Sequence, residues 1–181
     1  LGTTYTEGLR TGIALRKSMQ DGVNTSRIPG LVTSRRGTLL AIYDARWESS
    51  RDLQGDIDIA LNRSEDGEKT WQPMQRILDR KEWGNLPEKY NGVADACILC
   101  DENTGTLYVA GLWMHGVLDG QTGRWVEGLT QDSTRWIHQW FDKGSQPGLG
   151  VKETSQFLIT KSTDDGKTWS EPVNITSQVK R

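Results

Sequence analysis

Charged side chains stand at three places in the sequence where a β-strand is expected to meet a loop. Arg27 opens the tetrapeptide RIPG, whose proline would fix the backbone that carries the guanidinium. Arg46 ends the run YDAR, Asp52 follows it in a polar loop, and Asp95 stands between small residues in VADACILC. A guanidinium held in place can grip an anion, and a carboxyl group can transfer a proton. The alternative for each is an ordinary solvated residue.

Two similar octapeptides show how the chain is organised around these residues. SEDGEKTW covers 64–71 and STDDGKTW covers 162–169. Both contain turn chemistry, because Asp66 and Asp164 can accept backbone N–H bonds and glycine permits a positive φ. In the first octapeptide Gly67 comes one place early and Glu68 stands where the second has Gly166. We expect both to be structural turns and neither to bind calcium, which needs more oxygen ligands.

Alternating apolar and polar residues predict four strands before and after the middle of the chain, in the same order. Each octapeptide lies in the last hairpin of its set. Two copies of one four-stranded antiparallel sheet are typical of a β-propeller. The sequence therefore predicts an all-β fold in which blade one covers about 27–80 and blade two about 92–181, with an insertion at 114–150 and a leader strand or linker at 1–26.

The composition excludes several classes of protein. Of 181 residues, 34% are hydrophobic and 25% are charged, and the net charge is -2. These values are typical of a folded domain and not of a disordered or collagen-like chain. The near-neutral balance without a basic stripe argues against nucleic-acid binding. No apolar run is long enough to predict a membrane span, and the first residues lack the apolar core of a signal peptide.

Taken in order, RIPG, the DAR tripeptide with Asp52 behind it, an Asp box and then VAD resemble the start of the catalytic propeller of bacterial exo-α-sialidases. The octapeptides resemble the Asp boxes, or BNR repeats, of that family. The resemblance runs from about Arg27 to Trp169. It implies a six-bladed propeller of which this chain covers the first two to three blades.

The resemblance also implies roles for individual residues. Arg27 would be the first of three arginines that grip the carboxylate of sialic acid, and Asp52 would be the general acid/base. Arg46 and Asp95 would line the pocket near the ring substituents. Trp113 would form the aromatic wall for the N-acetyl group, and Gln156 would contact the glycerol tail.

The chemistry of the substrate fits these roles. A planar arginine fork is the natural partner of a carboxylate, and lysine would be a poor substitute. The bound carboxylate would repel an anionic nucleophile, and sialidases use a tyrosine instead. Asp52 would protonate the leaving oxygen and later deprotonate water, which requires partial desolvation of its carboxyl group.

Several parts of such an enzyme are expected outside this chain. In the family the nucleophilic tyrosine, its glutamate partner and two further arginines come later. We therefore expect the remainder of the propeller, as a C-terminal segment or a second chain, to be a partner alongside the sialylated glycoconjugate substrate. The resemblance further implies a protein that is secreted, periplasmic or held at the cell surface and that needs no cofactor.

Other residues have simpler interpretations. Cys97 and Cys100 would lie on opposite faces of one strand, so we expect packing residues and no disulfide. His115 and His138 in the insertion lack a third metal ligand at useful spacing, and we expect no metal site. The tryptophan-rich insertion is either a lid or sugar platform, or a segment packed over the rim.

Two functional alternatives remain beside the hydrolase. The chain could belong to a propeller that binds sialic acid without catalysis, in the manner of a lectin. It could also belong to a structural or adhesion propeller that uses only its Asp boxes, although that would leave Arg27, Arg46, Asp52 and Asp95 unexplained. A transferase with the same site is a variant of the leading hypothesis.

Overall fold

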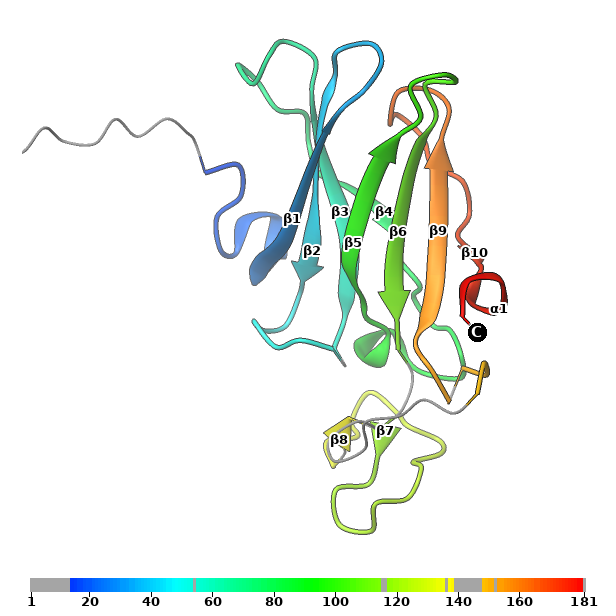
Figure 1. Ribbon diagram of the computed structural model, residues 1–181. Helices are drawn as coiled ribbons and strands as arrows, with labels where there is room; N and C mark the ends of the chain where they lie inside the picture. Colours follow the sequence, from blue (N-terminus) through cyan, green and yellow to red (C-terminus); the bar gives the residue numbers. More distant parts are fainter. Residues whose placement is uncertain are drawn as a thin grey trace, which may run out of the picture.

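Two antiparallel four-stranded sheets stand side by side in the molecule (Figure 1). The computed structural model describes residues 14–53, 55–114, 117–135, 137–138, 148–151 and 153–180. Sheet 1 has the order β1-β2-β3-β4, with β1 (Thr25–Thr33), β2 (Leu39–Arg46), β3 (Ile57–Ser64) and β4 (Gln75–Leu78). Sheet 2 has the order β10-β9-β6-β5, with β5 (Val93–Cys100), β6 (Leu107–Trp113), β9 (Gln156–Ser162) and β10 (Val173–Asn174). The all-β class is confirmed, whereas the number of blades and the closed ring stay predictions.

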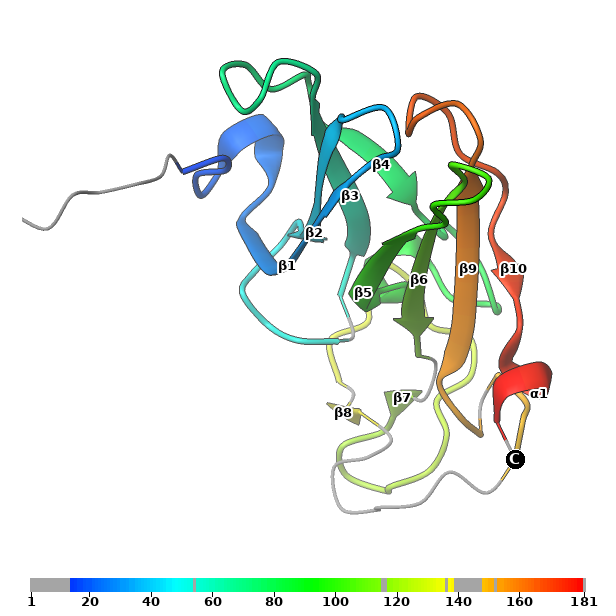
Figure 2. The same ribbon diagram turned by 45° about the horizontal axis from the view of Figure 1, so that its top comes forward.

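The remaining elements are short. They are the 3-10 helices η1 (Gln20–Gly22) and η2 (Glu88–Tyr90), the strand pair β7 (Val117–Leu118) and β8 (Ile137–His138) in the insertion, and the helix α1 (Thr176–Val179). Figure 2 shows β7 and β8 beyond the ends of β6 and β9, on the same side as the loop between β2 and β3.

The main core lies between the two sheets. Leu40 and Ile42 of β2 belong to the same buried cluster as Leu107 and Val109 of β6. Alternation places these side chains on facing surfaces, and burial of each contributes about 1.5–3 kcal/mol. At Gly30 a Cβ would lie 2.9 Å from Cγ1 of Ile42, its pairing partner on β2, and 3.7 Å from Cγ2 of Ile98 in sheet 2. The glycine in RIPG is therefore required by packing.

Part of the opposite face of sheet 1 is covered by the segment that precedes it. Val23, just before β1, packs with Tyr43, Ala45 and Ala60 in a second small cluster. The Tyr43 hydroxyl donates a hydrogen bond to Asn62 Oδ1 at 2.6 Å, and burial raises the pKa of Tyr43 to about 12. This tyrosine is a core residue.

The two Asp boxes form the same turn despite their different sequences. The carboxylates of Asp66 and Asp164 each accept a backbone N–H from the threonine four residues on, at 2.9 Å. Gly67 and Glu68 have φ of 69° and 70°, and the matching positions of the second box, 165 and 166, have 70° and 79°. The shifted glycine does not change the turn, because two successive residues take left-handed conformations in both boxes.

The second Asp box also joins the sheets. Asp165 Oδ2 accepts a hydrogen bond from Thr38 Oγ1 at 2.6 Å, and the Asp165 carbonyl accepts one from Arg63 Nε at 2.9 Å. Both donors belong to sheet 1 or its hairpin, so a turn of sheet 2 is anchored on sheet 1.

Cys97 and Cys100 are both free thiols. The prediction of no disulfide is confirmed. Cys100 packs against the main core, whereas Cys97 is exposed on the face of β5 that turns away from sheet 1. The packing role is confirmed for Cys100, and that of Cys97 stays a prediction, because it depends on what covers this face of sheet 2.

Candidate active site

Both sheets contain a β-bulge at the same place in their first strand. In sheet 1 the pairing of β1 with β2 shifts between Arg27 and Gly30, and in sheet 2 the pairing of β5 with β6 shifts between Ala94 and Cys97. Ile28 has a φ of 53° and Asp95 a φ of 55°. A β-branched residue with positive φ is rare, and such backbone strain is concentrated at functional sites. By register Asp95 corresponds to Ile28, and Ala94 corresponds to Arg27.

The bulges place Arg27 and Asp95 at the same end of the molecule. Both side chains are exposed. Arg27 lies opposite Asp44 in the pairing of β1 with β2. The loop that contains Asp52 leaves β2 at this end, while the Asp-box turns lie at the opposite end of the sheets (Figure 1).

Arg46 is the best-anchored of the predicted site residues. Its side chain is 1% exposed, and Nη2 lies 3.0 Å from Asp44 Oδ2 and 2.5 Å from Asp52 Oδ1. Nη1 donates to the Ser50 carbonyl at 3.0 Å. A buried guanidinium with two carboxylates and a loop carbonyl around it has one fixed orientation.

Asp52 reaches Arg46 from the solvent side. Its side chain is 75% exposed. The loop that carries it is closed at its base, because the Trp47 N–H donates to the Asp56 carbonyl at 3.1 Å. The structure thus brings Arg46 and Asp52 together, and it leaves the Asp52 carboxyl group without the desolvation that the predicted acid/base role requires.

Asp44 was missed as a site residue. Its side chain is fully buried, and besides Arg46 it accepts the backbone N–H of Asp95 at 3.2 Å. Burial raises the pKa of Asp44 to about 6, against the opposing effect of Arg46. The signal was present in YDAR, because residues two apart on a strand share a face and an aspartate in an apolar strand needs a partner.

Trp113 does not fit the predicted aromatic wall. It is fully buried, its indole N–H donates to Asn91 Oδ1 at 3.0 Å, and its ring meets Trp83 edge-on at a centroid distance of 4.4 Å. Further parts of a propeller could only bury the ring more. Trp113 therefore supports the loop after sheet 1, and its predicted contact with a substrate is corrected.

Gln156 does not fit the predicted substrate contact either. It is 2% exposed, and its amide nitrogen donates to the carbonyls of Leu149, Gly150 and Thr154 at 3.3, 3.2 and 2.9 Å. Its amide oxygen accepts from Asn174 Nδ2 at 2.9 Å. The amide nitrogen thus holds the end of the insertion and the amide oxygen holds β10, so the buried Gln156 has a structural role in this sheet.

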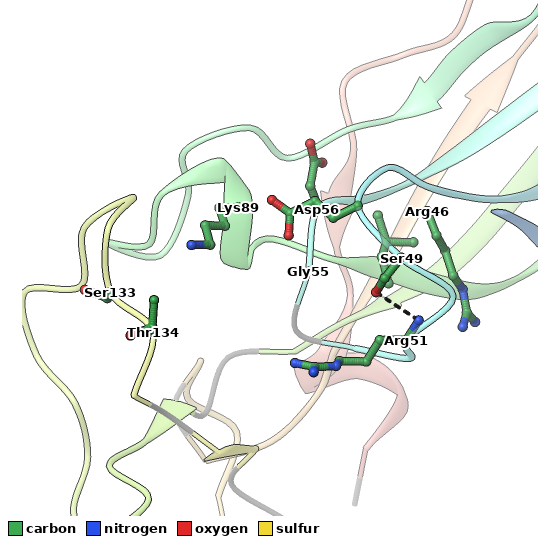
Figure 3. Close-up of a pocket in the computed structure, with 10 residues that line it drawn as sticks. Arg46, Ser49, Arg51, Gly55, Asp56, Lys89, Ser133 and Thr134 are labelled. Carbon is green, nitrogen blue, oxygen red and sulfur yellow. Dashed lines mark hydrogen bonds between the residues drawn. The ribbon is translucent and has the colours of Figure 1, made fainter. Parts of the chain in front are cut away.

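A cavity of about 220 Å³ opens beside Arg46, between the 47–56 loop, η2 and the insertion. Figure 3 shows Arg46 and Arg51 on one side, Lys89 and Thr134 on the other, and Asp56 between them. Of the predicted site residues, Arg46 lines this cavity.

The described residues contain no group of three or more His, Cys, Asp or Glu that could hold a metal ion. His115 and the side chain of His138 lie outside the described residues. No helix among the described residues is long and apolar enough to cross a membrane.

Residues 28–181 match the family model described as a BNR repeat-like domain. The chain belongs to this family. Its BNR repeats are the two Asp boxes, which the structure places after β3 and β9.

Relatives of this BNR repeat-like chain include sialidases of known sequence and structure. A sialidase of Bacteroides fragilis is 44% identical over 171 residues, which are 94% of this chain and 28% of the relative. A sialidase of Micromonospora viridifaciens is 28% identical over 166 residues, which are 91% of this chain and 21% of the relative.

Solved structures agree. The Hadza microbial sialidase Hz136 has a TM-score of 0.70 and 41% identity, over 89% of this chain and 28% of that one. A leech intramolecular trans-sialidase, at 16% identity and a TM-score of 0.63 over 98% of this chain and 38% of that one, shares the fold. The chain spans less than a third of the length of the two sialidases that are more than 40% identical to it.

Proposed function

We propose that this chain is part of a retaining exo-α-sialidase, which releases terminal sialic acid from glycoconjugates. Asp52 is the general acid/base, Arg27 grips the substrate carboxylate, and Arg46 and Asp95 line the pocket. The observation that carries the proposal is the contact of Asp52 with the buried Arg46, at the end of the sheets where both first strands bulge. The similarity to sialidases in sequence and fold supports it.

The geometry suits the two steps of the reaction. Asp52 stands on a loop whose base is closed, with most of its carboxyl group open to a substrate. In the first step it would give a proton to the leaving glycosidic oxygen, and in the second it would take one from water. The exposed Arg27 guanidinium offers a planar fork for the carboxylate on the anomeric carbon.

The proposal includes the remainder of the propeller as a partner. The face of sheet 2 that turns away from sheet 1 carries Leu99 and Val173, which are 62% and 55% exposed. On sheet 1, Leu31 is 64% exposed. Further blades would cover these side chains and supply the tyrosine, its glutamate and two arginines. We also propose that the enzyme is secreted or periplasmic.

Kinetics of the complete enzyme test this proposal with two substrates. One is a sialyl-galactoside with a poor leaving group, and the other is an aryl sialoside whose phenolate needs no protonation. Asp52→Ala should lower kcat/KM on the galactoside by about 10²–10⁴-fold and change kcat/KM on the aryl sialoside much less. The ratio kcat/KM is the measure because the second step, in which Asp52 takes a proton from water, is common to both substrates and does not enter it. Arg27→Ala should raise KM for both.

Arg36→Ala is the matched control, because Arg36 is an exposed arginine at the other end of the hairpin that begins with Arg27. It should leave both substrates unaffected. Equal losses of kcat/KM on the two substrates in Asp52→Ala would rule out the acid role. Wild-type protein that binds sialic acid through Arg27 without turnover would instead be the lectin-like alternative.

A further inference from the structure

Asp44 is the only described carboxylate that contacts both sheets at the site. It extends from β2 on the same face as Arg46, two residues further on. Its Oδ2 accepts from Arg46 Nη2 at 3.0 Å, and its Oδ1 accepts from the Asp95 backbone N–H at 3.2 Å. One buried carboxylate therefore touches a side chain of sheet 1 and the bulge of sheet 2.

The hydrogen bond from Asp95 to Asp44 is made by a strained part of the backbone. Asp95 has a φ of 55° at the bulge of β5, a conformation that residues other than glycine adopt at a cost. A hydrogen bond from its N–H to a buried carboxylate stabilises that conformation. It also determines where the exposed Asp95 side chain points from the strand.

The Arg46 contact continues toward Asp52. Arg46 holds Asp44 on one side and Asp52 on the other through the same nitrogen, Nη2, and holds the Ser50 carbonyl through Nη1. Without Asp44 the guanidinium would lose the partner that fixes its buried side. The position of the Asp52 carboxylate would then be set only by an exposed loop.

We propose that Asp44 is a positioning residue of the site, which fixes Arg46, and through it Asp52, against the bulge that carries Asp95. Asp44 is fully buried and cannot touch a substrate itself, so it acts through its two partners. This inference rests on the proposed role of Asp52 as the acid.

The test uses Asp44→Asn in the complete enzyme with the same pair of substrates. Asparagine keeps an oxygen for the Asp95 N–H but has no negative charge for Arg46. In the first step, which kcat/KM reports, a misplaced acid should matter only where the leaving group needs a proton. We expect kcat/KM on the sialyl-galactoside to fall by about tenfold to a hundredfold, and kcat/KM on the aryl sialoside to change by no more than about threefold.

Asp58→Asn is the matched control. Asp58 is a second buried aspartate in sheet 1, 1% exposed, which contacts Trp47 and Arg76 and neither Arg46 nor Asp95 in the contacts observed. A loss of stability alone would affect both substrates equally in either variant. If Asp44→Asn yields no folded enzyme, Asp44→Ser is measured by the same criterion. Serine has no amide NH₂ group that would point at the Arg46 guanidinium.

The outcomes separate this inference from the proposed function. A selective loss is a larger fall in kcat/KM on the sialyl-galactoside than on the aryl sialoside. The positioning role is supported if Asp52→Ala and Asp44→Asn both show a selective loss and Asp58→Asn does not. Selective loss in Asp52→Ala alone, or equal losses on both substrates in Asp44→Asn, overturns it and leaves the function standing. No selectivity in Asp52→Ala removes the acid role, and the inference about Asp44 falls with it.

Discussion

Three aspartates at the site end of sheet 1 lie where burial disfavours their charged form. Burial raises the pKa of Asp44 to about 6, and it raises the pKa values of Asp56 and Asp58 to about 7 with the help of neighbouring carboxylates. Arginine partners oppose these shifts. At this end of the sheet, ionised carboxylates are therefore unfavourable at neutral pH. Clusters of groups with shifted pKa values are common at functional sites.

We predict that Asp58→Asn makes the stability of the protein less dependent on pH. The pKa of Asp58 in the folded state, about 7, exceeds its value in an unfolded chain, 3.8. Between these values the folded state holds a proton that the unfolded state has released, so the free energy of unfolding falls as pH rises. Asparagine cannot ionise. Urea denaturation of the complete protein at pH 5 and pH 8 measures the free energy of unfolding of the variant and of the wild type. The difference, variant minus wild type, should be more positive at pH 8 than at pH 5 by at least about 1 kcal/mol.

If the variant and the wild type differed in free energy of unfolding by the same amount at both pH values, the prediction would be contradicted. The amide oxygen of the variant can still accept the Trp47 indole N–H, which Asp58 binds at 2.8 Å. Loss of that hydrogen bond therefore does not obscure the comparison.

At the scale of elements, the Asp boxes show that one turn geometry accepts two sequences. In the first box Glu68 occupies a left-handed position with a φ of 70°, where the second box has Gly166. The Glu68 N–H donates to Ser64 Oγ at 3.0 Å, and the Gly166 N–H donates to Ser162 Oγ at 2.9 Å. The hydrogen bonds of the motif impose the conformation, and Glu68 bears its steric cost.

We predict that Glu68→Gly stabilises the protein by about 1 kcal/mol, because glycine adopts this conformation without the clash of a Cβ. Lys69→Gly in the same turn is the control. Lys69 has no positive φ, so glycine there should lower the free energy of unfolding through the entropy of the unfolded chain. Thermal denaturation of both variants checks the prediction, and a destabilised Glu68→Gly would refute it.

At the scale of the whole molecule, each sheet packs one face against the other sheet and leaves apolar side chains on its second face. Ile98 on β5 packs against the core, so its neighbour Leu99 points to the other face, where it is 62% exposed. Two isolated sheets with such faces would be prone to association, because exposed apolar surface favours contact with other molecules. We expect further blades of a larger ring to cover these faces.

We predict that Leu99→Asp destabilises the complete protein by about 2–3 kcal/mol, since it would bury a charge without a partner beneath the next blade. Leu99→Met, which keeps volume and polarity, should cost less than about 1.5 kcal/mol. Denaturation midpoints of the complete protein measure both. An unchanged midpoint for Leu99→Asp would mean that this face stays in solvent.

The sequence by itself determined the strands, their order and the two turns, because alternation and turn residues act over a few neighbouring positions. It also placed Arg46 and Asp52 close in sequence where a strand meets a loop. The ion pair between them is a result of the tertiary structure, because six residues of loop can reach far from the strand end.

Only the tertiary structure decided which charged or aromatic side chains face the site. Trp113 and Gln156 stand in alternating strands like the site residues, yet sheet 2 buries both on its packed face. The role of Asp44 depends on a backbone N–H from the other sheet, and the positive φ of Ile28 is opposite to the preference of a β-branched residue. Register between strands and packing between sheets impose these features, and both depend on residues far apart along the chain.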